Sequence, residues 1–104
     1  MIDVIVLYRN TETLKFNMNY YLGTHIPLVH ELLGGALKHA TVQQGLGGAV
    51  PGSKAEFAVI CRLGFDSVEA FQTAFGPHAA AVQGDVVNFC NEPPIVQVSD
   101  VRVV

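Results

Sequence analysis

Charged residues are scarce in this chain: only 14% of its 104 residues are Asp, Glu, Lys or Arg, whereas 50% are hydrophobic. Ordinary globular domains carry about 25% charged residues. A small domain has much surface for its volume and relies on charged side chains to stay soluble. The shortage therefore predicts that part of the surface is covered by another copy of the chain, and we expect a homodimer.

A cluster of basic residues is also missing. Lysine and arginine together number six, they are scattered along the chain, and the net charge is −3. Proteins that bind nucleic acid usually neutralise rows of phosphates with a basic stripe. The composition therefore argues against a nucleic-acid partner.

Signals for membrane insertion, export and metal binding are absent as well. No apolar run reaches the roughly 18 residues of a membrane span, and the start "MIDVIVLYRN" lacks the features of a signal peptide. The two cysteines, Cys61 and Cys90, form no CxxC pair, and no set of His, Cys and carboxylate residues has ligand spacing. We expect no membrane span, a cytoplasmic location with reduced thiols, and neither a metal nor another cofactor.

The hydrophobic patterns predict one domain over residues 1–104 with the element order β-α-β-β-α-β. Strands are expected at residues 2–8, 37–46, 56–65 and 94–104, and helices at Met18–Leu33 and from Asp66 to Phe89, with a possible restart at Gly76-Pro77. This order is typical of the α+β ferredoxin-like fold, in which two helices cover one face of a sheet. Because the strands are apolar on both faces, the open face should pack against the same face of a second copy.

The first predicted helix, in "NMNYYLGTHIPLVHELLG", carries a histidine where leucine would pack more easily. At about 100° per residue, one narrow sector of this helix holds Met18, Leu22, His25, Val29 and Leu32. His25 should therefore face the sheet. Pro27 removes one helical hydrogen bond and presses on the carbonyl of Gly23. The resulting bend either opens space beside His25 or follows the curvature of the sheet.

The second predicted helix repeats this pattern. Its inward sector holds Val68, Phe71, Phe75, His78 and Val82. A histidine on an apolar face is either a core residue with one hydrogen bond or a group that transfers protons, and two of them facing one sheet make a shared cleft plausible. Tyr21 could add a hydroxyl to that cleft. Asp85 and Asn88, in "GDVVNF", either cap the helix end or form the rim of a pocket.

Three motifs resemble the EthD family of small bacterial proteins. They are Tyr-Tyr-x-x-x-His-x-Pro-Leu at 20–28, Phe-Gly-Pro-His at 75–78 and Gln-Val-Ser-Asp-Val at 97–101. The resemblance implies a dimeric α/β barrel, in which two ferredoxin-like subunits pack sheet against sheet and each encloses a small apolar cavity. The family's recurring positions correspond to Tyr20, Tyr21, His25, Pro27 and His78.

The resemblance implies two possible functions. One is a cofactor-independent enzyme for isomerisation, dehydration or decarboxylation of a hydrophobic cyclic or aromatic metabolite in catabolism. In it, His25 is the general acid or base, His78 a second proton-transfer group, and Tyr21 the donor to an oxyanion. The other is a non-catalytic accessory protein that binds or delivers a hydrophobic ligand, as in ether degradation. The predicted ligand-binding residues are Tyr20, Leu22, Phe71, Phe75, Asn88 and Phe89.

Overall fold

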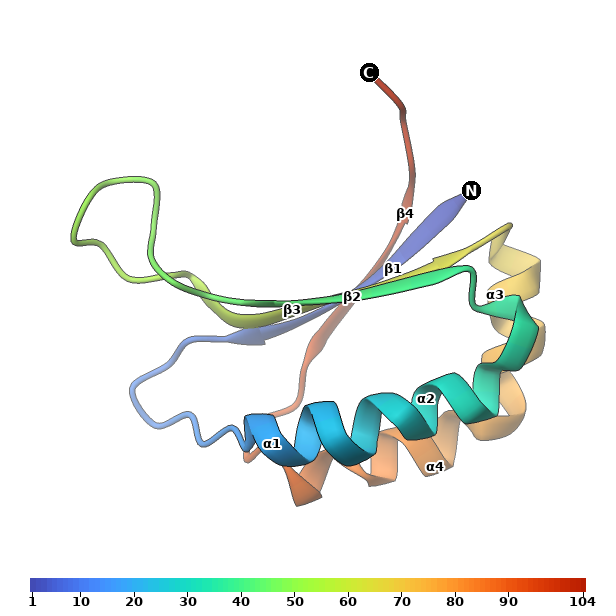
Figure 1. Cartoon of the computed structure of the whole chain (residues 1–104), viewed down its shortest axis with the longest axis horizontal. Helices are drawn as coiled ribbons and strands as arrows, with labels where there is room; N and C mark the ends of the chain where they lie inside the picture. Colours follow the sequence, from blue (N-terminus) through green and yellow to red (C-terminus); the bar gives the residue numbers. More distant parts are fainter.

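Four antiparallel strands form one sheet, and helices cover one of its two faces (Figure 1). The computed structural model describes residues 1–104. The strands are β1 (Ile2–Arg9), β2 (His39–Gln44), β3 (Phe57–Phe65) and β4 (Ile95–Asp100), and their spatial order is β2-β3-β1-β4. This topology confirms the predicted ferredoxin-like fold. None of the helices combines the length and the apolar character that crossing a membrane requires.

The first helical segment follows its predicted bounds. It comprises α1 (Met18–Tyr20), a π turn η1 (Tyr21–His25), α2 (Ile26–Leu33) and a closing 3₁₀ turn η2 (Gly34–Ala36). The side chain of Asn17 caps its start by accepting a hydrogen bond from the backbone N–H of Tyr20 at 3.0 Å. Gly34 ends α2 with φ of 56°, a conformation that favours glycine.

The π turn is the local response to Pro27, which has no N–H to donate to Gly23. The N–H of Ile26 instead bonds to the carbonyl of Tyr21, five residues back. A turn with an extra residue shifts the phase of the helix, so its buried residues lie four apart: Tyr21, His25, Val29 and Leu33. The predicted inward position of Leu22 is therefore wrong, and this residue is 50% exposed. At Gly23, whose carbonyl Pro27 leaves without its usual partner, an added Cβ would meet nothing within 4 Å.

The second helical segment restarts at Gly76-Pro77, which is one of the two predicted alternatives. It comprises α3 (Val68–Phe75), η3 (Gly76–His78), α4 (Ala79–Gly84) and η4 (Val86–Asn88). The helix begins two residues after the predicted start at Asp66, and Ser67 caps it: the Ser67 hydroxyl accepts a hydrogen bond from the N–H of Ala70 at 3.1 Å.

The last strand is shorter than predicted. β4 pairs only with β1, and its final pair joins Asp100 to Ile2, where β1 begins. Residues 101–104 have no neighbouring strand to pair with, and Figure 1 shows the C-terminus extending beyond the sheet. The strand predicted at 94–104 therefore ends at Asp100.

The two faces of the sheet differ in what covers them. On the inner face, the helices bury side chains such as Val4, Tyr8 and Cys61. Because side chains alternate along a strand, Ile5, Leu7 and Ile60 point to the opposite face, which no helix covers (Figure 1). These three residues are partly exposed.

A buried carboxylate lies at one end of the uncovered face. Asp3 is only 3% exposed and accepts hydrogen bonds from Arg62 Nε and His39 Nε2, each at 3.0 Å. Burial acts to raise the pKa of Asp3, but these two neighbours outweigh that effect and hold it below the usual value. Asp3 is therefore an ionised carboxylate, and the side chains of His39 on β2 and Arg62 on β3 shield it from solvent.

Candidate functional site

An apolar cavity of about 200 Å³ lies between the sheet and the helices. Of the 17 residues that line it, 14 are hydrophobic, and the other three are His25, Gln83 and Pro94. The hydrophobic lining comprises Val4, Val6, Tyr8, Tyr21, Ile26, Val29, Leu33, Cys61, Leu63, Phe71, Phe75, Val82, Val86 and Val96. A concave, mostly apolar space with a few polar groups is the usual form of a small-molecule site.

His25 and Asp85 form a hydrogen-bonded pair in this wall. Nδ1 of His25 is 2.8 Å from Oδ2 of Asp85, and the two side chains are only 6% and 12% exposed. His25 occupies the last position of the π turn, and Asp85 lies between α4 and η4. The pair therefore joins the two helical segments at the edge of the cavity.

Two further donors hold the Asp85 carboxylate in place. The Tyr20 hydroxyl donates to Oδ1 at 2.7 Å, and the Asn88 side-chain amide donates to the same oxygen at 2.9 Å. Burial acts to raise the pKa of Asp85, but the hydrogen bonds from Asn88, Tyr20 and the imidazole outweigh it and lower this pKa. The carboxylate is therefore ionised at neutral pH.

The ionised carboxylate determines which imidazole nitrogen carries the proton. Because Asp85 has no proton to donate, Nδ1 of His25 must be the donor in their hydrogen bond. In the neutral ring, Nε2 then holds the free lone pair. No buried side-chain nitrogen or oxygen lacks a partner, and Nε2 makes no hydrogen bond within the protein, so it must be accessible. His25 is also one of the residues that line the cavity.

Aromatic rings enclose the imidazole. The ring of Tyr21 stacks on His25 with centroids 5.5 Å apart, and Phe89 packs against it at 4.5 Å. Burial raises the pKa of Tyr21, and nearby Cys61 and Tyr8 raise it further. Tyr21 is therefore a neutral phenol at physiological pH, able to donate a hydrogen bond.

Cys61 and Tyr8 also line the cavity, on the sheet side. Burial raises the pKa of both groups, so the thiol and the phenol stay protonated. A thiol is a poor nucleophile in that state, because the thiolate is the reactive form. These side chains therefore supply shape and weak polarity rather than nucleophilic chemistry.

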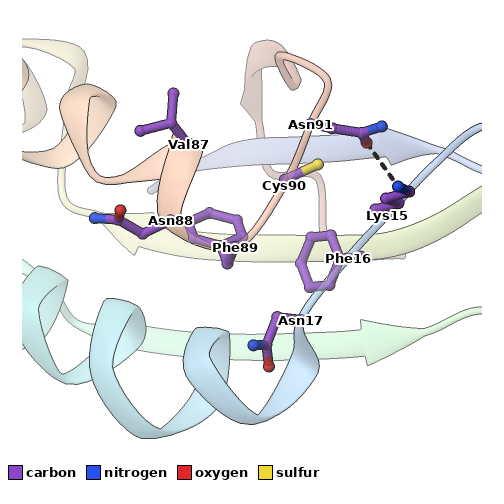
Figure 2. Close-up of a pocket in the computed structure, with 8 residues that line it drawn as sticks. All are labelled: Lys15, Phe16, Asn17, Val87, Asn88, Phe89, Cys90 and Asn91. Carbon is purple, nitrogen blue, oxygen red and sulfur yellow. Dashed lines mark hydrogen bonds between the residues drawn. The ribbon is translucent and has the colours of Figure 1, made fainter.

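A second hollow lies beside Phe89 at the surface (Figure 2). Its three asparagine side chains are already engaged within the protein, and Lys15 is its one charged lining residue. Asn91 accepts from the backbone N–H of Lys15 at 2.8 Å (Figure 2). Asn17 caps α1, and Asn88 donates to Asp85. Because it contains no pair like His25–Asp85, this hollow is a weaker candidate for chemistry than the cavity at His25.

The structure brings together some of the predicted site residues and separates others. His25, Tyr21, Phe71 and Phe75 line the cavity, whereas His78 lies in η3, half-buried and outside its lining. Leu22 points to solvent. Tyr20, Asn88 and Phe89 do not line the cavity. Tyr20 and Asn88 donate hydrogen bonds to Asp85, and Phe89 packs against His25.

Asp85 was not among the predicted site residues. Its only signal in the sequence is a carboxylate within the apolar stretch "GDVVNF", which favoured helix capping over a place on the rim of a pocket. Gln83 was missed because it lies outside the predicted inward sector of the second helix, and an exposed glutamine there gives no signal of a site. No three side chains of His, Cys, Asp or Glu gather closely enough to hold a metal ion.

Comparison with known proteins gives a consistent family assignment. The EthD domain model matches residues 10–93. An EthD-like protein from Ralstonia eutropha JMP134 is 37% identical, with a TM-score of 0.92 over 98% of this chain and 92% of that one. An ethyl tert-butyl ether D (EthD) family protein from Bacillus halodurans C-125 is 21% identical, with a TM-score of 0.76 over 98% and 99% of the two chains.

A more distant structure shares only the fold. A dimeric ferredoxin-like protein of unknown function from Thermobifida fusca YX has a TM-score of 0.59 at 16% identity, over 96% of this chain and 90% of that one. A search of curated proteins finds no match.

Proposed function

Given that this chain belongs to the EthD family, we propose that it binds a small hydrophobic cyclic or aromatic molecule and moves a proton on it through His25. One observation carries the proposal: an imidazole paired with an ionised carboxylate forms part of the wall of an otherwise apolar cavity. A buried charge pair is costly to maintain unless its geometry and hydrogen bonds compensate for desolvation. Such groups are frequent at sites of chemistry.

The geometry supports His25 as a general base. Nε2 would accept a proton from a carbon next to the ligand's carbonyl group, and the positive charge that develops would be stabilised by Asp85 at 2.8 Å. The C–H electron pair would become the double bond of an enolate, and the carbonyl pair would move onto oxygen. Tyr21 lines the same cavity, and its neutral phenol would donate a hydrogen bond to that oxygen.

The fate of the proton distinguishes two reaction classes. If imidazolium returns it to another carbon of the same molecule, the result is an isomerisation. If imidazolium gives it to a departing hydroxyl group, water leaves and the result is a dehydration. Both schemes use only His25, Asp85 and Tyr21 and need no co-reactant. His78 has no role in them, because it lies outside the cavity lining.

The test measures proton abstraction without knowledge of the product. A panel of cyclic ketones and aromatic lactones is incubated with the protein in deuterium oxide, and mass spectrometry follows deuterium uptake. For a true substrate, His25→Asn should lower the enzyme-dependent rate by about 10²–10⁴-fold. His30→Asn, on the exposed side of the same helix, is the control. Binding without any exchange would overturn the catalytic proposal and identify the accessory binding function.

We also propose that two copies pair through the uncovered face of the sheet. The partly exposed Ile5, Leu7 and Ile60 form its apolar centre, and a protein of the same fold is described as dimeric. A charge placed there would be buried in a dimer and solvated in a monomer. Leu7→Lys should therefore lower the mass measured by light scattering from that of a dimer to that of a monomer. An unchanged dimer mass in Leu7→Lys would contradict this pairing.

A further inference from the structure

A groove of about 470 Å³ on the surface adjoins the cavity at His25. Gln83, Val86, Pro94 and Val96 line both spaces, so the two share a wall where the end of α4 meets the start of β4. The remaining residues of the groove are Val87, Cys90, Asn91, Glu92 and Pro93. The groove therefore adjoins the cavity on the side where a ligand arriving from solvent would first meet it.

Only one polar side chain in this groove is free to bind a ligand. The Asn91 amide is engaged with the backbone of Lys15 and of Thr13, at 2.8 and 2.9 Å. The Glu92 carboxylate accepts hydrogen bonds from the hydroxyls of Thr11 and Thr13. Gln83 makes no side-chain hydrogen bond within the protein, and it is the only side-chain amide that lines the cavity as well as the groove.

We infer that the groove is the mouth of the cavity and that Gln83 determines which ligands it admits. The ligand would be amphiphilic: an apolar ring lies against His25, and an uncharged hydrogen-bonding group, such as a hydroxyl or carbonyl, reaches Gln83. The carboxylate of Glu92 in the same groove disfavours an anionic end. This inference rests on the proposed function of the cavity and adds the chemistry of the ligand's second end.

The test uses three probes that share a phenyl ring and differ at the other end: ethylbenzene, phenethyl alcohol and phenylacetate. Their dissociation constants are measured from backbone amide shifts in NMR titrations of the full chain. One net hydrogen bond contributes about 0.5–1.5 kcal/mol, so the alcohol should bind about two- to tenfold more tightly than ethylbenzene. Phenylacetate should bind most weakly.

The variant Gln83→Leu should abolish the advantage of the alcohol and leave ethylbenzene affinity within about twofold of wild type. Gln72→Leu is the matched control, because Gln72 is exposed on α3 and lines neither space. The inference is overturned if alcohol and hydrocarbon bind the wild type alike, or if the advantage survives in Gln83→Leu. If no probe binds the folded wild type, the proposed function of the cavity fails together with the inference. The outcomes in which probes bind without the expected preference overturn the inference alone.

Discussion

Asp85 and His25 are 60 residues apart in the chain, yet Oδ2 of the first lies 2.8 Å from Nδ1 of the second. This bond connects the end of the second helical segment to the π turn of the first. Because Tyr20 and Asn88 also donate to the carboxylate, the pair is held from three directions. The imidazole is thereby fixed in orientation and tautomer before any ligand arrives.

The first prediction concerns acid stability. The pKa of Asp85 is lower in the folded chain than its reference value of 3.8, so its ionised form stabilises the fold above that pH and the contribution is lost as pH falls through the folded-state pKa. Asp85→Asn should lower the free energy of unfolding at neutral pH by about 1–3 kcal/mol. When the free energy of unfolding, measured by urea denaturation, is plotted against pH, Asp85→Asn should also make its fall at acid pH less steep.

Asp66→Asn is the control for this measurement. The Asp66 side chain is 67% exposed, and its ion pair with Lys38 is long, at 3.8 Å. Its profile should follow that of the wild type, because exposed ion pairs contribute little. Parallel acid limbs for wild type and Asp85→Asn would contradict the assigned role of the Asp85 carboxylate.

The second prediction concerns Phe89, whose ring contacts His25 and also packs against Tyr8, Phe16 and Tyr21. Phe89→Ala should destabilise the fold by about 3–5 kcal/mol, because a cavity would replace a 3% exposed aromatic ring. Val87→Ala, two residues earlier and 81% exposed, should change stability by less than about 0.5 kcal/mol. Thermal unfolding of both variants tests this, and equal losses would contradict the packing described.

The third prediction concerns Gly23 in the π turn. A Cβ there would meet nothing within 4 Å, and alanine is a better helix former than glycine. Gly23→Ala should therefore raise the free energy of unfolding by about 0.5–1 kcal/mol. Gly34→Ala should lower it, because Gly34 has φ of 56°. If Gly23→Ala is instead destabilising, the ring of Pro27 does crowd this position.

The fourth prediction concerns the shielded carboxylate on the open face. A Cβ on Gly64 would clash with the imidazole ring of His39, so Gly64→Ala must displace the imidazole from Asp3. The loss of this hydrogen bond should cost about 1 kcal/mol. In a His39→Ala background the same substitution should cost much less, and a double-mutant cycle measures the difference. Additive costs would show that Gly64 acts independently of His39.

Much of the architecture follows from local patterns in the sequence. The order of the strands and helices, the Asn17 cap and the stop at Gly34 are readable because periodicity and turn residues act over a few positions. The inward position of His25 was predictable for the same reason. The apolar character of both sheet faces was visible in the strands themselves.

Only the tertiary structure decided which polar groups meet. A single extra residue in the π turn rotated Leu22 outward and brought Tyr20 within reach of Asp85. The restart at Gly76-Pro77 left His78 outside the cavity that His25 lines. Helical phase and the packing of distant segments set these outcomes. A shift of one residue turns a helix by about 100°, so the neighbours of each side chain depend on the geometry that the chain adopts at Pro27 and at Gly76-Pro77.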